Sequence, residues 1–193
     1  DPMCGSGTLV IEAAMMALDI APGGRRPFGF ERLKNFDRAA WETIKADALA
    51  REKPRTALPI TGSDLYGDEL KNARANLNAA GLDGVVTLKQ ANVLEMPAPA
   101  SNGVIVTNPP YGVRLGDTED LAAFYPKLGD ALKQKFAGWR AYILSADMAL
   151  PKLIRLSASK RTVLFNGALE CRLFEIKVVA GSARKPKPAA SAQ

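Results

Sequence analysis

The stretch that decides the fold runs from Gly103 to Tyr111 and reads GVIVTNPPY. Its apolar residues, Val104-Ile105-Val106, form the kind of short run that a buried parallel strand shows. Asn108-Pro109-Pro110-Tyr111 follows at once, and the two prolines cannot extend a strand ladder because they have no N–H group. We therefore predict a strand that ends in a rigid loop carrying a planar amide, backbone carbonyls and an aromatic ring.

Outward from this strand, helical and strand patterns alternate along the chain. The patterns predict helices over Thr8–Leu18, Asp37–Arg51, Asp68–Ala80, Leu121–Lys135 and Met148–Ile154. They predict strands over Leu58–Gly62, Val85–Lys89, Val104–Val106, Arg140–Leu144, Arg161–Phe165 and Arg172–Val179. Such alternation is typical of an α/β fold with a mostly parallel, doubly wound sheet covered on both faces. The last two strands predict a C-terminal antiparallel hairpin, and their spacing across Asn166-Gly167 favours a turn wider than two residues.

The chain opens inside a glycine-rich loop, Asp1-Pro2-Met3-Cys4-Gly5-Ser6-Gly7-Thr8. In a βαβ unit a strand delivers such a loop. We therefore expect a first strand in upstream sequence that is not represented here. The remaining pattern predicts one domain over residues 1–180 and a disordered basic tail over residues 181–193, rich in Pro, Ala and Ser.

Composition narrows the classes of function. Lys and Arg number 26 against 20 Asp and Glu, and the resulting net charge of +6 suits a polyanionic partner. No apolar stretch approaches the roughly 18 residues of a membrane span, so we predict no membrane partner. The chain has no histidine, which removes Ser-His triads, imidazole acid–base catalysis and most transition-metal sites. Its two cysteines make neither a disulfide framework nor a zinc cluster, so we predict no metal site and a reducing, cytoplasmic setting.

The glycine loop predicts a ligand site at the start of a helix. Gly5 and Gly7 permit a tight turn and close approach of a ligand, and the helix N-terminus that follows favours a carboxylate. A dinucleotide fingerprint needs a third glycine where this chain has Val10, and a P-loop needs a Gly-Lys-Ser/Thr sequence that is missing. The alternative is an ordinary strand–helix turn.

Four further residues are candidates for binding a nucleoside. Asp64, after the predicted strand Leu58–Gly62, can accept hydrogen bonds from two ribose hydroxyls, although Ser63-Asp64 can instead cap the helix that follows. Asn92 can bind an adenine edge, or simply form a turn. Leu65 and Val93 can sandwich the adenine ring.

Asn108-Pro109-Pro110-Tyr111 suits transfer to an exocyclic amine. The lone pair of such an amine is delocalised into the base, so the amine is a poor nucleophile. The Asn108 side-chain oxygen and the Pro109 carbonyl can accept its two N–H groups, and Pro110 helps to fix the backbone. With the glycine loop, this pattern predicts an N-methyltransferase that uses S-adenosylmethionine, with Asn108 beside both amine and cofactor. The alternative is a proline-rich strand end with a structural Asn cap.

The residues after the prolines predict contacts with nucleic acid. Tyr111 can stack on the base, which has to leave its helix to react. Arg114 can hold a phosphate or remain solvated. Cys4 lacks a neighbouring His or Cys in the sequence and is expected to be a packing residue rather than a nucleophile.

Three stretches together resemble a known family. They are the glycine loop, Asn108-Pro109-Pro110-Tyr111-Gly112 and Asn166-Gly167-Ala168-Leu169-Glu170-Cys171. They resemble the THUMP-associated class I RNA methyltransferases, most closely the RlmL-type 23S rRNA guanine-N2 methyltransferases. Phe30-Glu31-Arg32 with Asn35-Phe36-Asp37 is also similar to that group.

The resemblance implies a Rossmann-like class I methyltransferase domain that binds S-adenosylmethionine and methylates a guanine N2 amine of 23S rRNA. It also implies an upstream THUMP-containing region that captures RNA. Three alternatives remain open: a DNA adenine-N6 methyltransferase, an enzyme that modifies a protein glutamine amide, and an RNA-binding accessory domain without catalysis.

Overall fold

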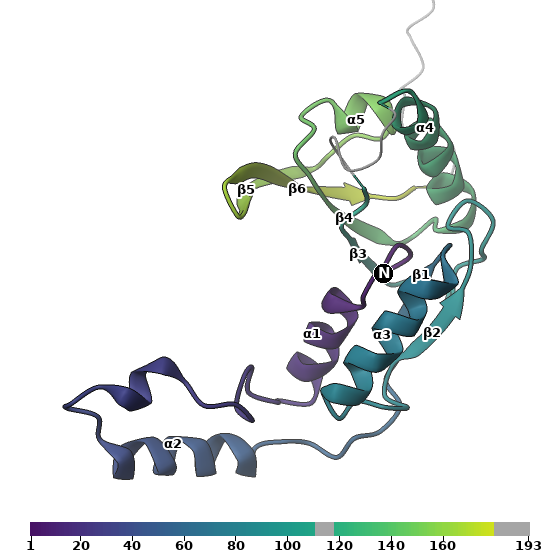
Figure 1. Cartoon of the computed structure of the whole chain (residues 1–193). Helices are drawn as coiled ribbons and strands as arrows, with labels where there is room; N and C mark the ends of the chain where they lie inside the picture. The colour runs from purple at the N-terminus through teal and green to yellow at the C-terminus, as the bar shows by residue number, and fades with distance from the viewer. Residues whose placement is uncertain (111–117, 180–193) are drawn as a thin grey trace, which may run out of the picture. The chain divides into compact units, whose positions relative to one another are not determined.

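The computed structural model describes residues 1–110 and 118–179, without side chains at 118–122 (Figure 1). Tyr111, Arg114 and the predicted basic tail over residues 181–193 lie outside the described residues. The chain forms two compact units, Asp1–Gln90 and Ala91–Gln193. The prediction of one domain over residues 1–180 stays a prediction.

In the first unit, two helices pack beside a pair of parallel strands. The strand β1 (Thr61–Asp64) pairs with β2 (Thr87–Gln90), and Thr61 lies opposite Thr87. The helices are α1 (Thr8–Ala17) and α3 (Gly67–Ala79). Their buried apolar side chains form one core with residues between the elements: Val10, Ala14, Leu18, Ile20, Leu77, Leu82, Val85 and Val86.

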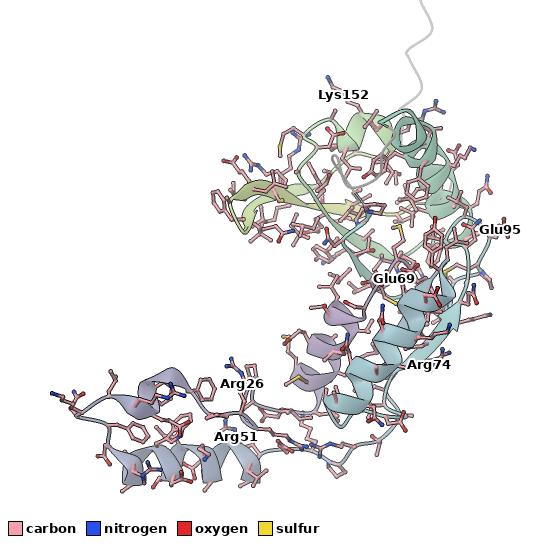
Figure 2. The ribbon with its side chains drawn as sticks, viewed as in Figure 1. Arg26, Arg51, Glu69, Arg74, Glu95 and Lys152 are labelled. Atoms are coloured by element: carbon pink, nitrogen blue, oxygen red, sulfur yellow. The ribbon has the colours of Figure 1, made fainter. Side chains whose placement is uncertain are left out.

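The segment between α1 and β1 forms an arm with its own aromatic cluster. It contains the 3₁₀ helix η1 (Gly29–Arg32) and the helix α2 (Arg38–Ala50), and no residue of either is buried. The Trp41 ring stands edge-on to Phe28 and Phe30, with centroid separations of 5.5 and 4.9 Å. Figure 2 labels Arg26 and Arg51 at the base of this arm. The family-like stretch Phe30-Glu31-Arg32 therefore lies within the short helix η1.

The second unit contains a four-stranded sheet in the order β3-β4-β6-β5. The strands are β3 (Val104–Thr107), β4 (Arg140–Ser145), β5 (Lys160–Asn166) and β6 (Leu169–Lys177). The pair β3–β4 is parallel, whereas β4–β6 and β5–β6 are antiparallel. The helices are α4 (Thr118–Lys135) and α5 (Leu150–Leu153). The helices α4 and α5 approach each other closely at Gly129. A Cβ added there would collide with the Ile154 carbonyl, so only glycine fits at this position.

The architecture confirms the α/β prediction and corrects two details. The described strands form two parallel and two antiparallel pairs, so the sheet structure is mixed rather than mostly parallel. The C-terminal antiparallel hairpin is present, but the prediction of a wide turn was wrong. Asn166 pairs with Leu169, so only Gly167 and Ala168 form the turn. The strand β6 begins earlier than predicted because Leu169 and Glu170 join the ladder although both are exposed.

Within the described chain, no helix has the length and apolar character needed to cross a membrane. The predicted boundaries of the other elements differ from the observed ones by at most three residues, as at the start of α4, which was predicted at Leu121 and lies at Thr118. The strand β1, for example, begins at Thr61 rather than Leu58, because Leu58 donates its N–H to Val85 outside the β1–β2 ladder.

Candidate active site

The glycine loop runs along one edge of β1. Asp1 donates its N–H group to the Thr61 carbonyl at 2.8 Å, and its own carbonyl accepts the Ser63 N–H at 2.8 Å. Cys4 then donates to the Ser63 carbonyl, again at 2.8 Å. The loop is therefore anchored by backbone bonds before it turns into α1.

Left-handed glycines make the turn. Gly5 has a φ of 50° and Gly7 a φ of 86°, a region in which residues with a Cβ are strained. Gly7 donates to the Cys4 carbonyl at 2.8 Å and is the N-cap of α1, where no side chain caps the helix. A Cβ added at Gly5 would meet nothing within 4 Å, so the loop is open at this point. An open glycine turn before an uncapped helix start suits a carboxylate-bearing ligand.

Cys4 is a packing residue, as its sequence context predicts. Its side chain is buried against Gly62, where an added Cβ would lie 3.2 Å from the Cys4 Sγ atom and 2.8 Å from Leu88. Burial, together with the charge of Asp64, raises the pKa of the Cys4 thiol to about 11. The thiol is therefore protonated at neutral pH, which makes it a poor nucleophile. Gly62 has a role that the sequence did not reveal, since it leaves room for the sulfur.

Asp64 holds the glycine loop against the end of β1. Its Oδ2 atom accepts the Gly5 N–H at 2.9 Å, and its Oδ1 atom accepts the Tyr66 N–H at 3.1 Å. The side chain is buried, whereas the neighbouring Leu65 is 52% exposed. Each carboxylate oxygen keeps one further acceptor position, since an ionised carboxylate offers about four. Asp64 therefore positions the loop whether or not it also meets a ribose.

In the second unit, the Asn92 side chain is engaged in a turn. Its Oδ1 atom accepts the Leu94 N–H at 3.0 Å, and its Nδ2 atom donates to Glu95 at 3.1 Å. These bonds match the turn-forming alternative. Val93 is buried. Contact of Asn92 or Val93 with an adenine stays a prediction.

The loop after β3 presents Asn108 on a fixed backbone. Thr107 is buried, Asn108 is exposed, and Pro109 is buried again. The Pro110 carbonyl accepts a hydrogen bond of 3.0 Å from the hydroxyl of Tyr125, a residue of α4 that is 2% exposed. Two prolines and this bond restrict the loop, while the amide of Asn108 faces solvent. Such a site can offer fixed acceptors to a planar amine.

Sequence reasoning missed Tyr125. The signal was available, because a tyrosine on the apolar side of an amphipathic helix needs a hydrogen-bond partner when it is buried. The sequence could not say which acceptor it would find.

The predicted site residues are thus divided between the two units. Asp1–Thr8, Asp64 and Leu65 belong to the first unit, and Asn92, Val93 and Asn108–Pro110 belong to the second. Among the described residues, no group of three or more His, Cys, Asp or Glu side chains is arranged to hold a metal ion.

Comparison with known proteins places this arrangement in a family. Residues 1–175 match the family described as UPF0020: RMKL-like, methyltransferase domain. The chain belongs to this RMKL-like methyltransferase family. It is 42% identical over 192 residues to the ribosomal RNA large subunit methyltransferase K/L of Shewanella sp. strain W3-18-1. That match covers 97% of this chain and 27% of the relative, so the chain spans about a quarter of the length of this relative.

Two solved structures share the fold of the RMKL-like domain. One is SMU.472, a putative methyltransferase complexed with SAH, with 34% identity and a TM-score of 0.84 over 95% of this chain and 48% of the other. The second is a predicted N6-adenine-specific DNA methylase from Listeria monocytogenes, with 30% identity and a TM-score of 0.79. That match covers 94% of this chain and 46% of the other.

Proposed function

We propose that this domain methylates the exocyclic N2 amine of a guanine in 23S rRNA, with S-adenosylmethionine as methyl donor. The observation that carries the proposal is the exposed Asn108 amide on a loop fixed by prolines and by Tyr125. Membership of the RMKL-like family supports methyl transfer, and the name of the Shewanella relative supports large-subunit rRNA as the substrate. Since that relative is much longer than this chain, the proposal concerns the parent protein as a whole.

The residues of the first unit fit the methionine end of the cofactor. The open glycine turn at Gly5 and the uncapped start of α1 suit its carboxylate. The loop Asp1–Thr8 would hold this end, and Asp64 would bind the ribose. Asn92 would bind the adenine edge, and Leu65 and Val93 would sandwich the adenine ring. SMU.472, which shares the fold, was solved in complex with SAH. When bound, S-adenosylmethionine supplies an electrophilic methyl group carried on a positively charged sulfur.

The residues of the second unit act on the amine. The Asn108 side-chain oxygen and the Pro109 carbonyl accept its two N–H groups, which draws the nitrogen away from planarity and frees its lone pair for attack. The prolines keep these acceptors in place, so little reorganisation is needed at the moment of reaction. The proton that the amine loses passes to water, and no imidazole is required. Tyr111 would stack on the base, and Arg114 would hold a phosphate.

We also propose that the fold is the Rossmann-like, doubly wound form, with a first strand supplied by the parent protein ahead of Asp1. Support comes from the edge of β1 that already bonds to Asp1 and Cys4, because a strand extending this pairing would lie parallel to β1. Amide exchange at Thr61, whose N–H faces the same edge as the Ser63 N–H that already bonds to Asp1, should slow markedly in a longer chain that includes the preceding residues. Unchanged exchange there would contradict this part of the proposal.

The setting follows from the substrate. We expect a THUMP-containing region elsewhere in the parent protein to capture the RNA, and we expect the protein to act in the cytoplasm, where ribosomes are assembled.

A second candidate is methylation of adenine N6 in DNA. The name of the Listeria monocytogenes protein favours it, and the acceptor pair at Asn108 and Pro109 suits that amine equally well. The 42% identity with an rRNA methyltransferase outweighs the 30% identity with the Listeria protein.

The test uses the complete parent protein, labelled S-adenosylmethionine, and deproteinised 23S rRNA beside DNA, followed by digestion to nucleosides. We expect the label in N2-methylguanosine. Label in N6-methyladenine from DNA would replace this function with the second candidate. No label in either nucleic acid, with cofactor bound, would overturn both.

A further inference from the structure

The tip of the β5–β6 hairpin exposes large apolar side chains. Val163, Leu164, Phe165 and Leu169 are 52%, 41%, 66% and 48% exposed. Figure 1 shows the hairpin extending away from α4 and α5 of its own unit. Nothing in the catalytic proposal uses these residues, yet they occur in and beside the stretch Asn166–Cys171.

The apolar residues occupy both faces of the hairpin. Directly paired residues share a face, and the pairs are Phe165 with Glu170, Leu164 with Cys171, and Asn166 with Leu169. Because side chains alternate along a strand, Val163 and Phe165 point to one face, whereas Leu164 and Leu169 point to the other. A surface that docks on a flat partner needs one apolar face. A tip that is apolar on both faces suits insertion between two flat surfaces.

Strand register places the tip at the edge of the sheet that carries Asn108. The strands β3 and β4 are parallel, so Asn108 follows β3 at the same edge where β4 ends at Ser145. Ser145 pairs with Arg172, and β6 extends three residues beyond this point, from Cys171 to Leu169. At about 3.3 Å per residue the hairpin overhangs that edge by roughly 10 Å.

The distance across the sheet between β6, which carries the tip, and β3, which precedes Asn108, is also short. The strand β6 is two strands away from β3 in the sheet order, which corresponds to roughly 10 Å at about 4.8 Å per strand. When a base is held at Asn108, the hairpin tip therefore lies close enough to contact the nucleotides next to that base. Ligands of open α/β sheets bind outside the carboxyl ends of the strands, which is the edge concerned here.

The charge around the hairpin favours a nucleic acid as the occupant. Residues 152–177 contain six Lys or Arg and two Asp or Glu. Both acids are ion-paired, Glu170 with Arg172 at 2.7 Å and Glu175 with Arg140 at 3.8 Å. Lys152, which points outward from α5 in Figure 2, Arg155 and Lys160 are exposed. Cations attract phosphates, so apolar side chains flanked by exposed Lys and Arg match stacked bases inside a phosphate backbone. They would be a poor match for a basic or neutral protein surface.

We propose that the hairpin tip is a wedge that enters the base stack of the RNA beside the target nucleotide, with Phe165 as its stacking side chain. By occupying the space between neighbouring bases, Phe165 and Leu169 lower the cost of extruding the target base toward Asn108. This inference rests on the proposed function, because it assumes a base that has to leave its helix.

The first test compares methylation of folded and heat-denatured 23S rRNA by the parent protein carrying F165A, F165L or F165W. F165A should lower kcat/KM on folded RNA about 5- to 100-fold, as expected for loss of one stacking contact, and much less on denatured RNA. F165W should retain activity, because its ring stacks, whereas F165L should not. The matched control is L49A, which removes an equally exposed apolar side chain from α2.

The second test does not depend on methyl transfer. The indole introduced by F165W should lose fluorescence when folded rRNA is added, beyond any change seen in the unsubstituted protein. If the unsubstituted protein is active and F165A is equally active on folded RNA, the wedge is wrong while the proposed function stands. Full activity of F165L would point to a protein partner or a second copy of the chain at the tip. If the unsubstituted protein is inactive, the result counts against the proposed rRNA methylation. Absence of fluorescence quenching in F165W would overturn the wedge independently of that result.

Discussion

The hydroxyl of Tyr125 donates a hydrogen bond of 3.0 Å to the carbonyl oxygen of Pro110. Tyr125 is buried in α4, and Pro110 ends the described part of the loop that presents Asn108. The bond ties the candidate catalytic loop to the core of the second unit. Through this bond, changes in α4 would reach Asn108 and Pro109, the proposed acceptors for the amine.

Replacing Tyr125 by Phe tests this tie. Y125F keeps the ring and removes the donor, so the cost should be about 0.5–1.5 kcal/mol of unfolding free energy. We expect kcat/KM for RNA to fall about tenfold, because the loop loses one restraint on its geometry. Urea unfolding and methylation kinetics measure the two effects. Unchanged kinetics with lowered stability would restrict Tyr125 to a structural role.

Replacing Asn108 by Ala tests the mechanism. N108A removes the side-chain acceptor for the amine, and we expect turnover to fall at least 100-fold, as for loss of a preorganised transition-state contact. Affinity for the cofactor, measured by calorimetry, should change by less than about threefold. The matched control is N102A, which alters an exposed asparagine that bonds only to Ser101 among the described residues. Near-normal turnover of N108A would refute the mechanism.

Replacing Asp64 by Asn tests the anchoring of the glycine loop. In D64N an amide nitrogen faces either the Gly5 or the Tyr66 N–H, so one of the two bonds is lost. We expect a loss of about 1–3 kcal/mol in stability and a weaker affinity for S-adenosylhomocysteine. D68N serves as the control, because Asp68 is highly exposed and pairs only with Lys71 in the described structure. Equal behaviour of the two variants would show that Asp64 does not hold the loop.

The raised pKa of Cys4 predicts a dependence of stability on pH. The thiol titrates near 9.0 when unfolded and at about 11 when folded, so the folded state holds its proton more tightly. The contribution is complete below pH 9 and is lost as the pH rises toward 11. Unfolding midpoints at pH 8 and 10.5 should therefore differ more for the unsubstituted protein than for C4A. Parallel behaviour of the two proteins would contradict the raised pKa.

Binding of the parent protein to rRNA should weaken as salt increases. For single-stranded contacts, the logarithmic slope should be about 0.7 for each phosphate neutralised. Filter binding or fluorescence anisotropy over a range of KCl concentrations measures the slope. A flat response would count against a polyanionic substrate.

Local sequence predicted the elements better than their partners. The apolar run before Asn108 became β3, and the stripe after Thr8 became α1, because each pattern fixes which face is buried. The width of the C-terminal turn was misjudged, because Leu169 and Glu170 extend β6 through backbone pairing with β5 rather than through burial.

The candidate site shows the same division. The glycines at 5 and 7, Asn108 with its two prolines, and the absence of histidine are properties of the sequence, and from them the class of chemistry could be predicted. The tertiary structure decided what the polar side chains do. Asp64 and Gly5 are joined by a hydrogen bond although they lie 59 residues apart, and the Tyr125–Pro110 bond spans 15 residues. The overhang of the hairpin depends on the register of β6 against β4. The hydrogen bonds that form and the register that two strands adopt depend on which distant segments come together in space. A local pattern of residues does not specify those long-range contacts.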